Sequence, residues 1–432
     1  MIDPTAAPTV KQLALLSIPA IVIGAVSALV LWLLDVGAGW LQDQLWTELP
    51  ALVGATGSTP WWIILVMTLV GAAVGLVAQF MPGHAGPDSA VGGLEGPPPP
   101  IAVLPSLLIA VVLGLAGGVS LGPENPIMAI NGALAVAALA RLSNAVPPRL
   151  VVLLSAAGTL GALFGTPVGA ALVLTGMVAA VKAGGSLWDR MFLPLAAAGA
   201  GAITMHLLGA PTLAFDVEPM TEADGFDLLS GFLIAAVAAV AAIAIAWAFP
   251  YVHRAFHALK HPIVFTTLGG LVLGVLGAIG GPITMFKGLE ETGELISDPG
   301  AYSVPQLAMF AVVKLIALLV AASAGFRGGR IFPIVFVGVA IGLVGHGLFP
   351  DVPLSLAIAS GVLGTVLVGT RDGWMALFVA AILVGDPLVL PLLCVIIVPV
   401  WLIVTKAPAL EIEAPETPAP SPPTAPAEPA RP

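Results

Sequence analysis

The sequence has very little charge. Only 9% of its 432 residues are Asp, Glu, Lys or Arg, whereas 59% are hydrophobic and the mean hydropathy is +1.07. An average soluble domain is roughly a quarter charged, so this chain cannot cover its surface with polar groups in water. This excludes a soluble globular protein and predicts an all-α polytopic membrane protein in contact with a lipid bilayer.

The net charge of −10 could indicate a basic partner. However, much of the acid lies in a few loops and in the C-terminal tail, which favours solvated loops over a binding surface. No nucleic-acid partner is expected.

Cysteine is almost absent. The single one, Cys394, lies in the apolar run "LLCVIIV", which excludes a disulfide framework and a thiolate metal site. The six histidines show no metal-ligand spacing, and there is no nucleotide-binding loop or nucleophile–base arrangement. We therefore expect no metal, no cofactor and no enzymatic activity.

The sequence consists mainly of long apolar runs that are rich in glycine and proline. A spanning helix needs about 20 apolar residues, and several runs are shorter or longer than one span, which predicts tilted and broken helices. Non-helical backbone at membrane depth is tolerated only where it is buried in protein or lines a watery cavity, so the breaks indicate a pathway. The runs cover 13–34, 61–80, 101–121, 126–142, 150–181, 192–208, 228–249, 264–285, 304–325, 331–349, 352–370 and 373–403.

The two ends of the chain differ from its middle. No cleavable signal peptide is evident, and Lys11 and Lys406 weakly favour both termini in the cytoplasm. The last segment is rich in proline and acid and should be disordered. We expect a cytoplasmic segment 1–12, a membrane domain 13–406 in the bacterial cytoplasmic membrane and a tail 407–432, with polar loops at 209–227 and 287–303.

The chain also resembles itself at an offset of about 200 residues. Three pairs of segments in the same order predict two homologous halves, 13–208 and 228–403. Duplicated halves with matching breaks are a common build for transporters, with the substrate site where the broken helices meet. The paired segments begin at Gly71 and Gly270, at Gly117 and Gly325, and at Gly158 and Gly361.

Four broken segments could each place a helix N-terminus, with free N–H groups, inside the membrane. In two of them the plainer interpretation is preferred: an interfacial loop for "PGHAGPDSA" and helix packing by small residues for "ALFGTPVGAALVLTGM". In "GFRGGRIFP" the N–H groups could face a small anion, and a basic cytoplasmic loop is compatible with that. These segments cover 82–90, 121–126, 162–177 and 325–333.

The remaining segment, "LGPENP", carries Glu124 at a predicted helix start, with no basic residue nearby in the sequence. Helix amides and the dipole stabilise a carboxylate there by up to ~2 kcal/mol. Ionisable groups inside a membrane are functional candidates, whereas the alternative is an N-capping residue at the membrane surface. Lys314 is a second charge in an apolar run; it could extend to an interface or attract anions, and both interpretations stay open.

These segments, in this order, resemble the ClC chloride channel/transporter family, and most closely its bacterial YfeO-type branch. The likeness covers most of 13–403, with "GHAGPD", "LAGGVSLGPE", "GTPV", "FRGGRIFP" and "TRDGW" as the matching blocks. It implies a homodimer in which each subunit has its own anion pathway, formed from two inverted halves.

The resemblance also implies roles for individual residues. The family's serine segment G-S-G-I-P is matched by "GHAGP", with His84 at the serine position; the gating segment G-R-E-G-P is matched by "GPENP", with Glu124 as the gate. Pro123 replaces the arginine and removes one N–H donor. The amide segment G-G-I-F-A-P is matched by "GGRIFP". The anion-binding residues implied in this way are His84, Gly122, Pro123, Gly329, Arg330 and Ile331.

Two features of the family are missing. The inner glutamate of proton-coupled members corresponds here to Thr175 and Gly176, and its central tyrosine has no match in 387–406. We therefore expect a passive or weakly coupled anion pathway, with chloride as the default ion. The alternatives are an anion/proton antiporter with altered selectivity, for fluoride as an example, and a non-transporting membrane scaffold or sensor.

Overall fold

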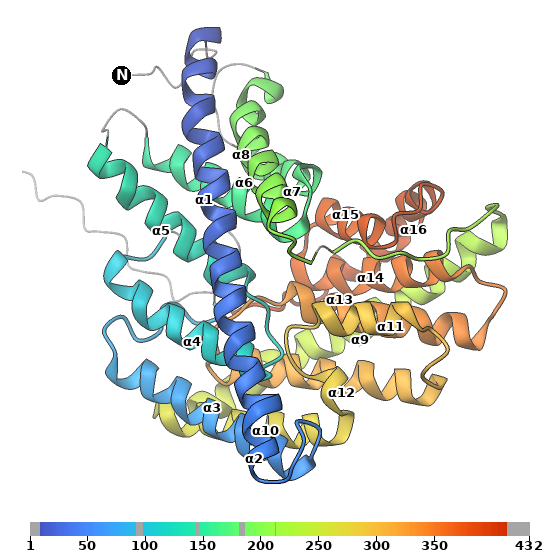
Figure 1. The fold of residues 1–432 in the computed structure, drawn as a ribbon. Coiled ribbons are helices and arrows are strands. Elements are labelled where there is room, and N and C mark those ends of the chain that lie inside the picture. The colour runs from blue at the N-terminus through green and yellow to red at the C-terminus, as the bar shows by residue number, and fades with distance from the viewer. Residues whose placement is uncertain (1–8, 92–97, 143–146, 181–185, 212, 413–432) are drawn as a thin grey trace, which may run out of the picture.

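The structure, a computed structural model, describes residues 9–91, 98–142, 147–180, 186–211 and 213–412 (Figure 1). In this part of the chain the regular structure is helical, apart from one isolated bridge between Gly122 and Gly329. The predicted all-α fold is confirmed. The helices before residue 208 are α1 (Val10–Asp43), α2 (Leu49–Leu52), α3 (Pro60–Phe80), α4 (Leu104–Ala116), α5 (Glu124–Leu142), α6 (Pro148–Phe164), α7 (Pro167–Ala180) and α8 (Leu187–Leu207). Those after it are α9 (Gly225–His257), α10 (Pro262–Gly280), α11 (Leu289–Ser297), α12 (Val304–Ser323), α13 (Ile331–Leu348), α14 (Leu354–Thr370), α15 (Gly373–Val384) and α16 (Val389–Val404).

Among the described residues, six helices are long and apolar enough to cross a membrane, and five shorter apolar helices accompany them. On α1 most of the apolar side chains face outward; Leu15 is 69% exposed and Trp40 66%. Such a surface would be unfavourable in water and is expected against lipid. The six candidate spans are Val10–Leu52, Pro60–Phe80, Gly225–His257, Pro262–Gly280, Val304–Ser323 and Ile331–Leu348.

Glycine and proline break the two longest apolar runs, as predicted. In 150–181, α6 ends at Gly165, which has a left-handed φ of 69°, and α7 begins at Pro167. In 373–403, α15 ends at Gly385, with φ 63°. Glycine adopts this conformation at helix C-termini without a Cβ penalty, and proline suits the first helical position.

The polar loop predicted at 287–303 contains a helix, so that prediction was wrong in part. Helix α11 buries Leu289, Leu295 and Ile296 on one face, while Glu290 and Glu294 lie on the other. Nine residues with charge at three positions do not resemble a membrane span. The amphipathic face was therefore missed.

The long helix α1 runs the full height of the molecule in Figure 1 and packs on α6 and α8. In the same way α9 packs on α14 and α16, and α3 packs on α10. Helices α5 and α6 contact each other, as do α13 and α14. The contacts of α1 with α6 and α8 thus correspond to those of α9 with α14 and α16, as expected for two homologous halves. The division into 13–208 and 228–403 stays a prediction.

Backbone approaches backbone where α6, α8 and α1 cross. A Cβ on Gly201 would overlap the carbonyl oxygen of Gly158, and a Cβ on Gly158 would meet the Cα of Gly24 at 2.5 Å. Small residues allow membrane helices to approach this closely, since packing rather than the hydrophobic effect holds them together.

Gly201→Ala should therefore destabilise the protein, because the added methyl group has no room against the α6 backbone. Overpacking of this kind costs about 1–3 kcal/mol, and the midpoint of thermal unfolding in detergent should fall. The matched control is Gly199→Ala on the same helix, where a Cβ would meet nothing within 4 Å. Both variants gain the same helix propensity, so equal unfolding midpoints would contradict the prediction.

Candidate functional site

Two of the predicted turns meet in the middle of the protein. The N–H of Gly122 donates to the carbonyl oxygen of Gly329 at 2.9 Å, and the N–H of Gly329 donates to that of Gly122 at 2.6 Å. This reciprocal pair places the start of α5 beside the start of α13, although the two helices are far apart in the sequence.

Glu124 lies at this junction and is fully buried. It is the first residue of α5, and its Oε1 accepts a hydrogen bond of 2.9 Å from the backbone N–H of Phe332, in the first turn of α13. Its Oε2 is buried, with no hydrogen-bond partner among the described residues. The carboxylate of one helix therefore occupies the positive end of the other.

The glycines on both sides make room for this carboxylate. A Cβ on Gly122 or on Gly329 would overlap a carboxylate oxygen of Glu124. Pro123 precedes the glutamate, has no N–H, and accepts the first helical hydrogen bond, from Ile127 at 2.9 Å. While the carboxylate occupies this position, a side chain at Gly122 or Gly329 would overlap it.

The residues predicted to donate amides lie at this same helix start. The N–H of Gly329 is used by the carbonyl of Gly122. Arg330 is the N-cap residue of α13 and Ile331 is its first residue. The amide of Phe332, the next residue, lies 2.9 Å from the carboxylate, and the amide of Ile331 also acts on it.

The side chain of Arg330 is 5% exposed, and its Nη2 donates to Oε1 of Glu411 at 3.2 Å. Glu411 lies beyond the last helix, within the predicted disordered tail 407–432. Residues 407–412 instead pack against the protein: Leu410 is 4% exposed, and the N–H of Ile412 donates to the carbonyl of Ala90 at 2.9 Å. These residues are ordered against the protein because Leu410 packs into the core and Glu411 pairs with the buried Arg330. Residues 413–432 lie outside the described residues.

The loop 82–91 is hydrogen-bonded to the turn before α13. Arg327 donates from Nε to the carbonyl of Ala85 at 3.0 Å and from Nη2 to that of His84 at 3.4 Å. Ser89 Oγ accepts from the N–H of Gly328 at 2.8 Å. The loop is therefore fixed to the segment that carries Gly329 and Arg330.

His84 has a left-handed φ of 50°, and its ring is directed back to α3. Its Nδ1 is 2.9 Å from the carbonyl oxygen of Ala78, in the last turn of that helix, and the residue is exposed. The structure thus places the backbone of His84 beside Arg327 and its imidazole against α3.

Lys314 is fully buried on α12 and lies at no interface. Its Nζ donates to the carbonyls of Met285 and Phe286 and lies 5.1 Å from the ring centre of Phe336. It fixes the irregular segment between α10 and α11. That segment contacts the first turn of α13, since a Cβ on Gly288 would lie 3.3 Å from the carbonyl oxygen of Phe332.

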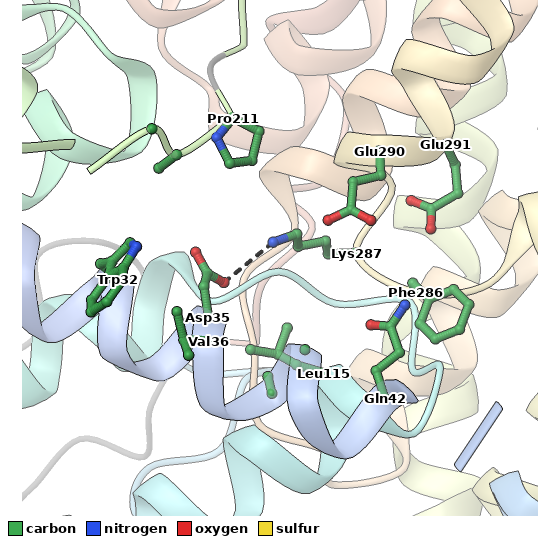
Figure 2. A pocket seen from close by; sticks show the side chains of 14 residues that line it. Trp32, Asp35, Val36, Gln42, Leu115, Pro211, Phe286, Lys287, Glu290 and Glu291 are labelled. Carbon is green, nitrogen blue, oxygen red and sulfur yellow. Dashed lines mark hydrogen bonds and ion pairs between the residues drawn. The ribbon is translucent and has the colours of Figure 1, made fainter. Parts of the chain in front are cut away.

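A polar cavity of about 250 Å³ opens beside this segment (Figure 2). Asp35 of α1 pairs with Lys287 across it at 3.2 Å, and Glu290 and Glu291 of α11 lie on the Lys287 side. The charge of Lys287 acts electrostatically on the carboxylate of Glu124. A mixed-charge cavity therefore lies within electrostatic range of the buried carboxylate, which does not line it.

On α7, the position matched to the inner glutamate carries no ionisable group. The hydroxyl of Thr175 donates to the carbonyl of Ala171 at 2.6 Å within its own helix, and Gly176 follows it. Neither residue can carry a proton in place of a carboxylate.

Comparison with known proteins gives consistent matches over most of the chain. The family model "Voltage gated chloride channel" matches residues 66–403. A relative from Escherichia coli (strain K12 / DH10B), named "Putative ion-transport protein YfeO", is 46% identical over 413 residues, which is 95% of this chain and 97% of that protein. A second, from Escherichia coli O1:K1 / APEC and of the same name, is 47% identical over 94% of this chain and 96% of that protein.

Solved structures share the fold. A fluoride/proton antiporter of the CLC type has a TM-score of 0.71 at 19% identity and covers 94% of this chain and 100% of its own. A slow cyanobacterial Cl⁻/H⁺ antiporter has a TM-score of 0.76 at 17% identity and covers 91% and 95%. At these identities the likeness shows the fold alone.

The predicted family and the predicted multi-pass membrane location are both confirmed by these matches. With a family model over most of its length and relatives at 46–47% identity, this chain belongs to the voltage-gated chloride channel (ClC) family of anion transport proteins.

Proposed function

We propose that this protein is a passive or weakly coupled anion pathway, with chloride as its default ion and Glu124 as its gate. The observation that carries the proposal is the position of the Glu124 carboxylate, at the N–H of Phe332 and between Gly122 and Gly329. A permeating anion would seek the same helix N-terminus.

The carboxylate is held loosely enough to be displaced. One oxygen has its hydrogen bond and the other, buried, has none in the described residues, and an unpaired buried polar atom costs roughly 1–3 kcal/mol. An arriving anion that takes the amide would release this cost as Glu124 swings toward water. The charges of Arg330 and Lys287 act on the same carboxylate and would attract the replacing anion.

Weak proton coupling follows from the lack of a second carboxylate. The usual route of coupled exchange uses a second ionisable group, which passes protons between the gating glutamate and the opposite side of the membrane. At the matching place on α7 the chain has Thr175 and Gly176.

A second candidate is anion/proton exchange with altered selectivity. A fluoride/proton antiporter has the same fold, and in an exchanger of this kind without the inner carboxylate Glu124 alone would carry protons. A non-transporting scaffold or sensor would be favoured by the absence of any anion-dependent flux.

Removal of the carboxylate tests the gate. Glu124→Ala in proteoliposomes should raise chloride efflux several-fold at neutral pH, because the anion no longer competes with a tethered carboxylate. Efflux is measured with a chloride electrode, and simultaneous pH recording of the unmodified protein should show little stoichiometric proton flux.

The control is Glu218→Gln, a change at an exposed loop acid that should leave efflux unchanged. Fixed proton countertransport by the unmodified protein would contradict the passive mechanism. A panel of halides in the same assay separates chloride from fluoride.

Glu411→Gln should raise the apparent affinity for chloride, because the change removes a negative charge 3.2 Å from Arg330 and so makes the potential at the start of α13 more positive. We expect a severalfold lower half-saturating chloride concentration in the efflux assay, again with Glu218→Gln as control. An unchanged or higher value would contradict a role for Arg330 in attracting the anion.

We further propose a homodimer with one pathway in each subunit. Light scattering of the detergent-solubilised protein, corrected for bound detergent, should give the mass of two 43.4 kDa chains. A mass of one chain at the same concentration would contradict this.

A further inference from the structure

We propose that Asp88, His253 and His257 form a binding site for a divalent transition-metal ion such as Zn²⁺, which would link the loop 82–91 to the end of α9. Nothing in the anion pathway described above uses these three side chains. Metal binding at this site does not depend on the proposed function.

The three side chains converge on one point. Oδ2 of Asp88 lies 3.4 Å from Nε2 of His253 and 3.4 Å from Nε2 of His257, and one ligand atom from each lies within 4.8 Å of the others. The two histidines are four residues apart on α9, so they share one face of the helix. This spacing was overlooked in the sequence, because the third ligand is 165 residues away.

The separations suit a tetrahedral metal ion. Bonds from Zn²⁺ to histidine nitrogen and carboxylate oxygen are about 2.0–2.2 Å, which sets neighbouring ligand atoms roughly 3.3–3.5 Å apart in a tetrahedron. The same separation of 3.4 Å between His253 and Asp88 also corresponds to a long hydrogen bond, which a bound ion would replace. Imidazole and carboxylate together suit zinc and the other first-row divalent ions.

The surrounding contacts orient the ligands. Nδ1 of His257 lies 3.0 Å from the carbonyl oxygen of His253; when it donates there, the lone pair of Nε2 is directed at Asp88. The other carboxylate oxygen of Asp88 accepts from the N–H of Ala90 at 3.1 Å and faces Arg327 at 3.8 Å. Metal ligands are typically held by such outer contacts.

The competing interpretation is a protonated histidine paired with Asp88. Both Nε2 atoms approach the same oxygen, and this oxygen can accept a hydrogen bond from each imidazole. The rings are stacked with centres 3.8 Å apart, so a charge on both would be unfavourable. A metal ion would instead bind both neutral imidazoles and the carboxylate, once a rotation of the stacked rings directs both Nε2 lone pairs at it.

The site can be reached and leaves a position open. The side chains of Asp88, His253 and His257 are 23%, 14% and 33% exposed, so water or solvent anions can complete the coordination. The loop also holds Ser89, which binds the N–H of Gly328 before α13. Metal binding would thus stiffen the loop that supports the anion site.

The test uses the full chain in detergent, freed of any polyhistidine tag and stripped of metal with a chelator. Titration with Co²⁺ alone should give the visible absorption of a tetrahedral complex at one ion per chain, and calorimetry with Zn²⁺ should give the same stoichiometry. Zn²⁺ should also raise the midpoint of thermal unfolding.

His253→Gln and His257→Gln should each weaken metal binding at least about tenfold and abolish the shift in unfolding midpoint. The matched control is His261→Gln, an exposed histidine just after α9, which should bind as the unmodified protein does. Since Asp88 also faces Arg327, the histidine variants decide the result even if Asp88→Asn fails to fold.

Several outcomes would overturn the proposal: no saturable binding, binding unchanged in both histidine variants, or an equal loss in the His261 control. Stability that depends on pH through His253 and His257, without metal binding, would assign the cluster to a histidine–carboxylate ion pair instead.

Discussion

The structure depends on the meeting of two helix N-termini around one carboxylate. Two reciprocal hydrogen bonds join Gly122 to Gly329, and the Glu124 side chain fills the space between them to reach the amide of Phe332. A buried charge is tolerated there because it faces the positive end of α13 rather than a basic side chain. This arrangement of two helix starts around Glu124 requires a break in the chain before α5 and before α13, and a glycine at each contact.

The N–H and C=O groups of irregular backbone at membrane depth must still form hydrogen bonds. The loop 82–91 has its carbonyls bound by Arg327, and Lys314 binds the carbonyls of the segment between α10 and α11. Both side chains are buried cations that serve backbone oxygens. Arg327 and Lys314, two of the few charged residues of this chain, therefore stabilise its non-helical segments.

Local features of the sequence predicted the all-α fold and drew attention to Glu124, whose role as a gate stays a prediction. Proline and glycine marked the breaks at Gly165 and Gly385, and Glu124 was conspicuous because no other acid lies in its apolar region. The sequence did not predict contacts between segments that are far apart in the chain. These are the contact of Glu411 with Arg330 and that of Asp88 with the histidines of α9. Helix α11 was not predicted because only three of its residues form the buried apolar face. The direction of the His84 ring was not predicted because it depends on a left-handed backbone that the sequence does not specify.

The position of Glu411 has a consequence for biogenesis. Arg330 enters the membrane with α13, but its acidic partner follows α16, the last helix. This ion pair can form only after every other helix has been synthesised and inserted. The charge of Arg330 is thus unopposed by Glu411 until the end of synthesis, and a chain interrupted after α16 but before Glu411 would have all these helices and yet lack this ion pair.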